Sequence, residues 1–355
     1  MDFAVTTLEF VAVVIVVLLA ALLVVLGAFA IATRILLRRG ARRAPRLGEL
    51  LTVDGVPLHY VERGSGPPVV FLHGAKGSVY DVLLSVGPQL AERYRLVAFD
   101  RPGLGYSGRP AAHGGAPAVQ AELIHSALEL LGIRRPVIVA HSAGAPVALE
   151  IALCHPDDVT AVVTLGGYTF SGRDEDRWPG MFITRGWFGR LLRETVVLPV
   201  LMLLAPFLLK RLFIPGHVDP AYARVAPALA LRPDTLHHDK TDVADIEAGL
   251  RDLATRYAQL RVPLVAVHGL ADYIVTAAMS VRLAQLCPST DLVLLEEVGH
   301  LPHFARPDAV VAAVDRAWEL AADTRTFDSP HWASYTPRSA ALGGEPAVPC
   351  TRNPL

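Results

Sequence analysis

Short apolar runs alternate with segments of helical periodicity along most of the chain. The apolar runs predict strands at Leu50–Val53, Pro57–Glu62, Pro68–Leu72, Arg95–Phe99, Val137–Ala140, Val159–Leu165, Leu264–Val267 and Leu292–Leu295. Helical periodicity predicts helices at Tyr80–Glu92, Pro117–Leu131, Pro146–Leu153, Ala277–Leu286 and Asp308–Ala321. Because short strands that are apolar throughout have both faces covered, the alternation predicts an α/β fold with a mainly parallel sheet and helices on both faces.

The N-terminal region contains one long uncharged run, from Phe10 to Ala32, without a proline. As a helix it would span roughly 35 Å, enough to cross the hydrocarbon core of a bilayer. A buried core helix is rarely apolar all round for this length, and a cleaved signal peptide needs basic residues before the run, where this chain has Asp2 and Glu9. We therefore expect a short N-terminal segment at 1–9, a transmembrane helix at 10–33 and a basic linker at 34–49.

Arginines cluster directly after this run, at Arg34, Arg38, Arg39, Arg42, Arg43 and Arg46. Positive charge next to a transmembrane helix stays on the cytoplasmic side of the membrane. The sequence thus predicts a single-pass membrane protein with its N-terminus outside and the rest of the chain in the cytoplasm.

The alternation of strands and helices is interrupted by an insertion at 169–245. It contains Thr195–Leu209, an uncharged stretch with two prolines that is too short to predict a second span. This stretch either forms the apolar core of the insertion or dips into the bilayer surface, because Arg190, Arg193, Lys210 and Arg211 flank it. The remaining divisions that we expect are a core in two parts, 50–168 and 246–322, and a disordered tail at 323–355.

Composition and charge exclude several classes of protein. Hydrophobic residues make up 52% of the chain, charged residues 19%, and the formal net charge is −1. These values exclude disorder as the main state, and they give no basic field for nucleic acid. Cys154, Cys287 and Cys350 lie far apart, which fits neither a disulfide framework nor a metal-binding motif.

The strongest chemical motif is Ala140-His141-Ser142-Ala143-Gly144, where a predicted strand ends and a helix begins. Small residues on both sides of Ser142 allow the sharp turn that presents a nucleophilic hydroxyl. The alternative is a serine that only caps the helix. A hydroxyl needs a base before it can attack, so the first interpretation requires a histidine and an orienting acid elsewhere.

Both partners follow later in the chain, each just past a predicted strand. Asp272 stands in the segment His268-Gly269-Leu270-Ala271-Asp272, and His300 follows Gly299. The order Ser142, Asp272, His300 is the one found in strand-turn-helix hydrolases. His300 would take the serine proton, and Asp272 would hold the imidazole in the required tautomer.

A fourth element is His73-Gly74-Ala75, after the first inner strand. Acyl transfer builds negative charge on a carbonyl oxygen, and backbone N–H groups can stabilise that charge. The N–H groups of Ala75 and Ala143 are the expected donors of this oxyanion hole.

From about Leu50 to Leu320 the chain resembles the α/β-hydrolase superfamily, in the branch with a cap domain. The resemblance rests on Phe71-Leu72-His73-Gly74, Asp100-Arg101-Pro102-Gly103-Leu104-Gly105-Tyr106-Ser107, the Ser142 motif, the Asp272 motif and Gly299-His300. It implies an α/β-hydrolase fold, a helical cap at 169–245 that shapes the substrate pocket, and the catalytic residues Ser142, Asp272 and His300. Ala140 departs from the common glycine, and Ala305 stands where relatives often carry an acid.

Other polar residues have structural interpretations. We expect His73 and His268 to bond to the backbone, and His303 not to replace His300. Asp291 is an alternative acid, but it precedes a strand where Asp272 follows one. His237-His238-Asp239 does not have the spacing of a metal site, and neither a metal nor another cofactor is expected.

The identity of the nucleophile limits the types of reaction that the sequence is compatible with. Epoxide hydrolases and haloalkane dehalogenases of this fold attack with a carboxylate, which Ser142 argues against. The sequence favours a serine hydrolase that cleaves carboxylic esters of an apolar or acyl-chain substrate. The membrane lipid is contacted by 10–33 and, in the second of the two interpretations of that stretch, by 195–209. The alternatives are carbon–carbon bond hydrolysis with the same three residues, perhydrolysis, amide or lactone hydrolysis, and a non-catalytic membrane-tethered fold that binds a lipid or partner.

Overall fold

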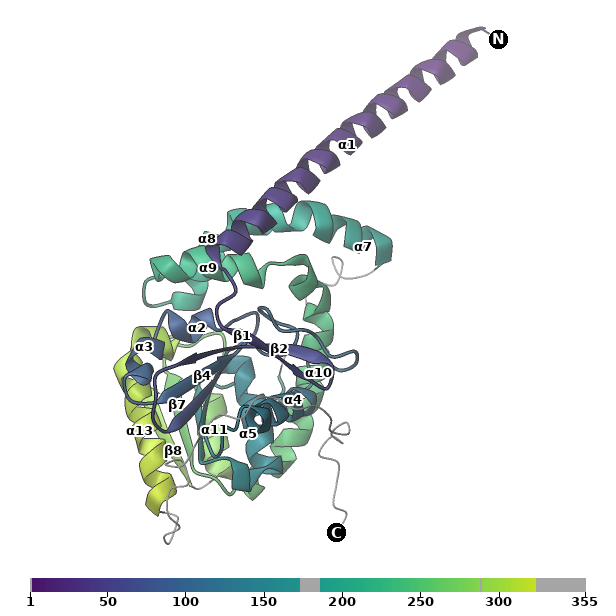
Figure 1. The fold of residues 1–355 in the computed structure, drawn as a ribbon. Coiled ribbons are helices and arrows are strands. Elements are labelled where there is room, and N and C mark those ends of the chain that lie inside the picture. The colour runs from purple at the N-terminus through teal and green to yellow at the C-terminus, as the bar shows by residue number, and fades with distance from the viewer. Residues whose placement is uncertain (1, 173–185, 288, 324–355) are drawn as a thin grey trace.

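The computed structural model describes residues 2–172, 186–287 and 289–323 (Figure 1). The predicted tail at 323–355 lies outside these ranges except for Asp323, which ends the last helix, α13 (Pro307–Asp323).

One sheet runs through the molecule. Its strands are β1 (Glu49–Val53), β2 (Val56–Arg63), β3 (Pro68–Leu72), β4 (Arg95–Phe99), β5 (Val137–His141), β6 (Ala161–Leu165), β7 (Leu264–Gly269) and β8 (Thr290–Leu295). They lie in the order β1-β2-β4-β3-β5-β6-β7-β8. The hairpin β1–β2 and the pair β2–β4 are antiparallel, and the other pairs are parallel. The predicted mainly parallel sheet is confirmed.

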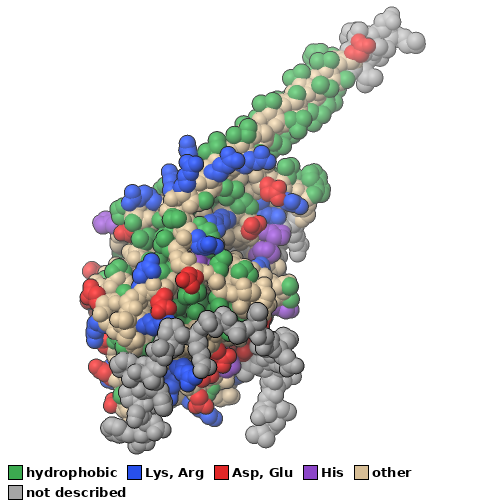
Figure 2. Space-filling model, in the orientation of Figure 1, with side chains coloured by type: hydrophobic (Ala, Val, Ile, Leu, Met, Phe, Trp, Pro, Cys, Tyr) green, Lys and Arg blue, Asp and Glu red, His purple; other side chains and the backbone are tan. Residues whose placement is uncertain are grey.

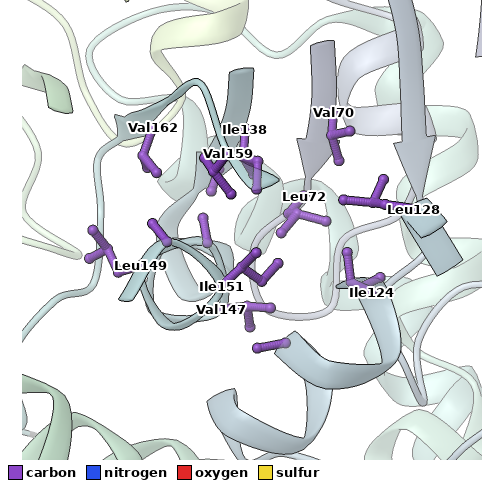
Figure 3. Packing of buried hydrophobic residues seen from close by; sticks show 14 of the residues in the cluster. Val70, Leu72, Ile124, Leu128, Ile138, Val147, Leu149, Ile151, Val159 and Val162 are labelled. Atoms are coloured by element: carbon purple, nitrogen blue, oxygen red, sulfur yellow. The ribbon is translucent and has the colours of Figure 1, made fainter. Parts of the chain in front are cut away.

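Helices cover both faces of the sheet. On one face lie α4 (Pro117–Leu130), α5 (Ala145–Cys154) and α11 (Ala278–Leu286), and their side chains join a buried cluster with Val70, Leu72 and Ile138 (Figure 3). The opposite face is packed by α13 and by the short helices α2 (Tyr80–Leu83) and α3 (Gly87–Ala91). The central strands β3 and β5 are buried throughout, which explains why they are apolar as far as His141 at the end of β5.

The single helix expected over Tyr80–Glu92 is wrong, because α2 and α3 are separate. Pro88 lies in the first turn of α3, where its missing N–H has no cost, whereas inside one continuous helix it would remove a backbone hydrogen bond and its ring would press on the preceding turn. At Gly87 the backbone passes close to α2, since an added Cβ would lie 2.5 Å from the Val82 carbonyl oxygen.

The described part of the insertion between β6 and β7 is mainly helical. It contains α7 (Gly186–Leu192), a π-helical turn (Arg193–Val197), α8 (Leu198–Phe213), α9 (Pro220–Ala230) and α10 (Pro233–Arg256). The two prolines do not break α8: Pro199 lies in its first turn, and the helix continues through Pro206. Helix α10 also passes the expected boundary at 245 without interruption.

The N-terminal helix α1 (Asp2–Arg43) is longer than the predicted transmembrane segment. The expected linker is helical as far as Arg43, because this part of α1 packs on the inserted helices. Leu36 and Leu37 join an apolar cluster with residues of α8, and Gly40 lies against Ala228 of α9, where an added Cβ would be 3.2 Å from the alanine Cβ. The N-terminal part of α1 projects from the molecule (Figure 1).

Two of the described helical stretches are long and apolar enough to cross a membrane by length and composition alone. They are Glu9–Arg43 and Gly186–Phe213. The most apolar 18-residue window of the first has a mean hydropathy of 3.4 and no buried residue, and that of the second has a mean hydropathy of 2.0 with 28% of its residues buried. Signal sequences and core helices of soluble proteins share these features. The second stretch is longer than Thr195–Leu209, because the π-helical turn joins α7 to α8.

Candidate active site

Ser142 occupies a strained turn between β5 and α5. Its φ is 49°, a left-handed conformation that non-glycine residues rarely adopt. The turn fits against β3 only because its neighbours are small: an added Cβ on Gly144 would lie 2.6 Å from the Leu72 carbonyl oxygen. Ala140, which departs from the common glycine, is fully buried beside Leu72 in the sheet, so a methyl group is accommodated there. The predicted sharp turn at Ser142 is therefore present.

The structure brings Ser142, His300 and Asp272 together. The Ser142 Oγ atom lies 3.1 Å from His300 Nε2, and His300 Nδ1 lies 2.8 Å from Asp272 Oδ2. Asp272 follows the end of β7, and His300 follows β8 in the next connection, so parallel strands carry both residues to the same sheet edge as Ser142. All three residues are more than 90% buried.

Asp272 is held as a carboxylate. Its Oδ1 atom accepts hydrogen bonds from the backbone N–H groups of Ile274 (2.8 Å) and Val275 (2.9 Å). Burial alone would raise the pKa of Asp272, but the hydrogen bonds from His268 and His300 outweigh burial and hold this pKa below its usual range. The charge stays available to orient His300 and to stabilise its protonated form.

The competing residues lie elsewhere. Asp291 is exposed and accepts a hydrogen bond from Arg316 Nε at 2.9 Å. His303 is fully buried, and burial lowers its pKa to about 3, so it remains neutral. Neither of its ring nitrogens has a hydrogen-bond partner among the described residues.

His73, His141 and His268 support the loops around Ser142. The backbone N–H of Arg101 donates to His73 Nε2 at 2.9 Å, and His268 Nε2 lies 2.8 Å from the Val275 carbonyl oxygen, so both make the backbone contacts predicted for them. His268 Nε2 also lies 3.4 Å from Asp272, a proximity that the sequence did not suggest. His141 Nε2 lies 2.8 Å from the carbonyl oxygen of His300 and ties the two loops together.

Ala75 and Ala143 line the same cavity as Ser142 and His300, which has a volume of about 230 Å³. Ala143 lies in the first turn after β5, where backbone N–H groups have no partner within the helix. The chain order leaves β3 for β4 and returns to β5, so the two alanines lie at the switch point between neighbouring strands. Open α/β sheets bind their ligands at such points.

The cavity also contains buried polar residues for which no individual role at the site was predicted from the sequence. Arg101 is buried, donates from Nη1 to Gln120 Oε1 at 2.7 Å, and has its pKa lowered to about 10 by burial. Asp81 is also buried, which raises its pKa to about 7. Glu247 on α10 accepts hydrogen bonds from the Gly172 N–H (3.0 Å) and from the hydroxyl of Tyr168. Arg101 belongs to a motif that the sequence singles out, whereas nothing in the sequence distinguishes Asp81 or Glu247.

Among the described residues, one group of potential metal ligands was found, remote from this cavity. It consists of His125, His155 and Asp158. The two imidazoles are stacked, with centroids 3.6 Å apart and an angle of 9° between their planes. A metal ion binds in the plane of an imidazole ring, and one ion cannot lie in two parallel planes at this separation. The arrangement fits His125 paired with Asp158 (3.0 Å) and His155 paired with Glu122 (3.2 Å).

Comparisons with known proteins cover the core of the chain. A family model described as "alpha/beta hydrolase fold" matches residues 67–307. A pimeloyl-(acyl-carrier protein) methyl ester esterase of Aeromonas hydrophila is 29% identical over 272 residues, which cover 72% of this chain and 97% of the relative. Haloalkane dehalogenase 2 of Mycobacterium tuberculosis is 27% identical over 272 residues (72% and 90%), and 2-hydroxymuconate semialdehyde hydrolase of Pseudomonas putida is 25% identical over 267 residues (73% and 89%).

Solved structures with a similar fold include a bacterial membrane phospholipase A. It superposes with a TM-score of 0.59 at 21% sequence identity, covering 87% of this chain and 98% of the other. At this identity the likeness is one of fold. The relatives by sequence are hydrolases of different bonds.

Proposed function

Because the chain belongs to the alpha/beta hydrolase fold family, we propose that it is a serine hydrolase that cleaves carboxylic esters through an acyl-enzyme on Ser142. The observation that carries this proposal is the continuous contact from Ser142 Oγ to His300 Nε2 (3.1 Å) and from His300 Nδ1 to Asp272 Oδ2 (2.8 Å). The likeness to a methyl ester esterase supports ester cleavage in particular.

The reaction begins when Ser142 Oγ attacks the ester carbonyl carbon and its proton passes to His300 Nε2. The carbonyl oxygen becomes negative and accepts hydrogen bonds from the backbone N–H groups of Ala75 and Ala143, each worth about 2.7–4 kcal/mol. When the carbon–oxygen bond breaks, His300 returns the proton to the leaving alcohol.

Water completes the cycle. It attacks the acyl-enzyme while His300 takes its proton, and collapse of the second tetrahedral intermediate releases the carboxylic acid and restores the Ser142 hydroxyl. Asp272 keeps the Nδ1 proton of His300 in place in both halves, so that Nε2 is free to accept. No cofactor takes part in this mechanism.

We propose that the helices of 169–245 act as a cap over this cavity. Apolar side chains, Leu212 on α8 and Ile246 on α10 among them, line it together with the polar residues described above. Such a lining suits an apolar or acyl-chain ester. The side chains of the cap would determine which acid and which alcohol the ester substrate contains.

The proposal includes a place in the cell. Residues 10–33 cross the membrane once, and the arginines from Arg34 onward keep the hydrolase domain on the cytoplasmic side. The apolar stretch 195–209 contacts the lipid surface on that side.

Carbon–carbon bond hydrolysis is the second candidate, favoured by the likeness to 2-hydroxymuconate semialdehyde hydrolase. It would use the same serine, histidine and aspartate. A non-catalytic role in binding a lipid or partner is the third, and it predicts that Ser142 is unreactive.

A fluorophosphonate probe separates the catalytic candidates from the third, because it labels only activated serines. We expect labelling of the folded protein that Ser142→Ala abolishes, and its absence in the folded wild type would contradict an active serine. A panel of nitrophenyl esters of increasing chain length, run beside a diketone-type substrate, then separates ester from carbon–carbon cleavage. Higher kcat/KM for the diketone than for every ester would favour the second candidate.

A further inference from the structure

The outward face of α7 and α8 is apolar and open to solvent. Val200, Leu203, Leu204 and Phe207 follow helical spacing along α8, and Leu203 is 82% and Phe207 63% exposed. Trp187, at the start of α7, is 80% exposed. An exposed apolar patch of this kind marks a surface that contacts something other than water. We call these five residues the α7–α8 face.

The opposite side of α8 is apolar as well. Leu198, Ala205, Leu209 and Phe213 are buried against α1, α9 and the loop after β8. A surface helix of a soluble protein has a polar side, whereas α8 is apolar all round until Lys210. This pattern is typical of a helix that lies in an apolar medium on its outer side.

The packing of α1 on α8 fixes where the α7–α8 face lies along the axis of α1. The uncharged run of α1 ends at Ala32, and Thr33 donates a hydrogen bond to the Thr195 carbonyl oxygen in the π-helical turn. Leu36, which packs with α8, lies only about 6 Å further along the helix axis. If α1 spans a bilayer, α8 therefore lies where the hydrocarbon core gives way to the headgroups.

The basic residues near the α7–α8 face are those expected for a surface that lies at the lipid headgroups. Exposed arginines follow the run on α1, and Lys210 and Arg211 end α8, so basic side chains gather where α1 meets the inserted helices (Figure 2). Glu194 is the single acidic residue in the segment 186–213, and it is paired with Arg190 at 2.8 Å. Basic residues beside an apolar face attract the anionic headgroups of a cytoplasmic leaflet.

The same helix reaches the cavity of Ser142. Leu212 of α8 lines that cavity, and it follows Arg211 directly. Tyr222 of α9 lines it too, and packs with Phe213 of α8 in one cluster. Helix α8 thus exposes one side to the surroundings of the protein and contributes Leu212 to the lining of the cavity.

We infer that the α7–α8 face docks on the surface of the bilayer that carries α1, and that the cavity takes an acyl-ester lipid from that leaflet. The inference rests on the proposed function and deepens it: it narrows the acyl-chain ester to a lipid of the host leaflet, names the side chains that contact the bilayer, and gives the direction from which the substrate enters. The occupant of the face is the anionic membrane surface, because its position along α1 and the basic residues beside it on α1 and α8 both favour it.

The contact is tested with the full chain reconstituted in phosphatidylcholine vesicles, with and without phosphatidylglycerol. Brominated lipids quench tryptophans that reach the bilayer, and a Trp187→Phe variant gives the share of Trp187. We expect strong quenching that this variant removes. Equal quenching in wild type and variant would overturn the docking.

The substrate class is tested with a double variant, Leu203→Glu with Phe207→Glu, neither of which lines the cavity. We expect roughly tenfold or greater loss of kcat/KM for an ester lipid embedded in the vesicles, and less than about twofold change for a soluble short-chain nitrophenyl ester. Leu130→Glu on α4, where the leucine is 59% exposed, is the matched control and should change neither rate.

Three results would contradict the inference. The first is the same ratio of lipid to soluble activity in the double variant and in the wild type. The second is a detergent-solubilised dimer that the double variant dissociates, because a second copy would then cover the face. The third is quenching of Trp187 with no hydrolysis of the vesicle ester by a protein that hydrolyses the soluble one. A wild type inactive on both esters would instead refute the proposed ester chemistry, while the quenching still tests the docking.

Discussion

Replacing Asp272 by asparagine tests the core of the proposed chemistry. The Oδ1 atom of Asp272 accepts the N–H groups of Ile274 and Val275, and an asparagine oxygen can take over both bonds. The amide nitrogen of the new side chain then faces His300 Nδ1, where Asp272 Oδ2 lies at 2.8 Å in the wild type. An NH₂ group can only donate there, so His300 must accept at Nδ1 and carry its proton on Nε2.

A proton on Nε2 removes the base. At 3.1 Å from Ser142 Oγ, that nitrogen would donate to the hydroxyl instead of accepting its proton. In serine hydrolases the wrong tautomer costs roughly 10⁴-fold in kcat. At 1.36 kcal/mol per tenfold, this loss corresponds to about 5 kcal/mol of activation free energy. The change in KM should be small, because Asp272 does not contact the substrate in the proposed mechanism.

The assay is steady-state hydrolysis of the best nitrophenyl ester, with circular dichroism to show that the variant is folded. Asp291→Asn is the matched control, because Asp291 is partly exposed, lies away from Ser142, and pairs with Arg316 among the described residues. We expect wild-type kcat for the control. A folded Asp272→Asn enzyme that loses less than about tenfold in kcat would refute the role given to Asp272.

Three further predictions concern the loop of Gly74, the buried carboxyl group of Asp81 and the packing of α1. Gly74→Ala should lower kcat roughly 10²-fold with a smaller effect on KM, because the new Cβ would lie 2.8 Å from His141 Nδ1 and displace the loop that carries the oxyanion donor Ala75. An unchanged kcat in ester hydrolysis would contradict this. Asp81 has a pKa raised by burial to about 7 against about 4 unfolded, so the folded state binds more protons in this window and stability falls as the pH rises through it. Asp81→Asn should flatten the decline of Tm from pH 4 to pH 8, whereas parallel curves would speak against a neutral Asp81. Gly40→Val should lower stability by about 1–3 kcal/mol in thermal unfolding of the detergent-solubilised full chain, because even an added Cβ at this position would lie 3.2 Å from the Cβ of Ala228. An unchanged Tm would argue against tight packing of α1.

The arrangement of Ser142, Asp272 and His300 was predictable because each lies just after a parallel strand. Small residues beside Ser142 indicate a tight turn, and parallel strands deliver their carboxyl ends to one edge of the sheet. The interpretation therefore rested on short-range patterns, on chain order and on the resemblance to the α/β-hydrolase superfamily. The sheet itself was predictable for a similar reason, since buried strands carry uniformly apolar sequences.

Features decided by tertiary contacts were not predictable. A run of arginines with no apolar stripe favours an exposed linker, yet residues 34–43 are helical because Leu36, Leu37 and Gly40 find partners on α8 and α9. Asp81 shows no sequence feature that separates it from a surface aspartate, since burial comes from distant segments. The position of His268 beside Asp272 likewise depends on how the loop after β7 curls back.

Helix α1 has no proline between Asp2 and Arg43, and it joins the inserted helices through side-chain packing rather than through a flexible tether. A spanning helix adapts to a thinner bilayer by tilting. If α1 spans a membrane as proposed, its tilt would rotate the whole hydrolase domain against the membrane plane, because α1 is about 63 Å long and its C-terminal part is packed on α8. The thickness of the bilayer would then set the angle between the α7–α8 face and the membrane surface. The rate of hydrolysis of membrane-embedded esters would therefore depend on the acyl-chain length of the host lipids.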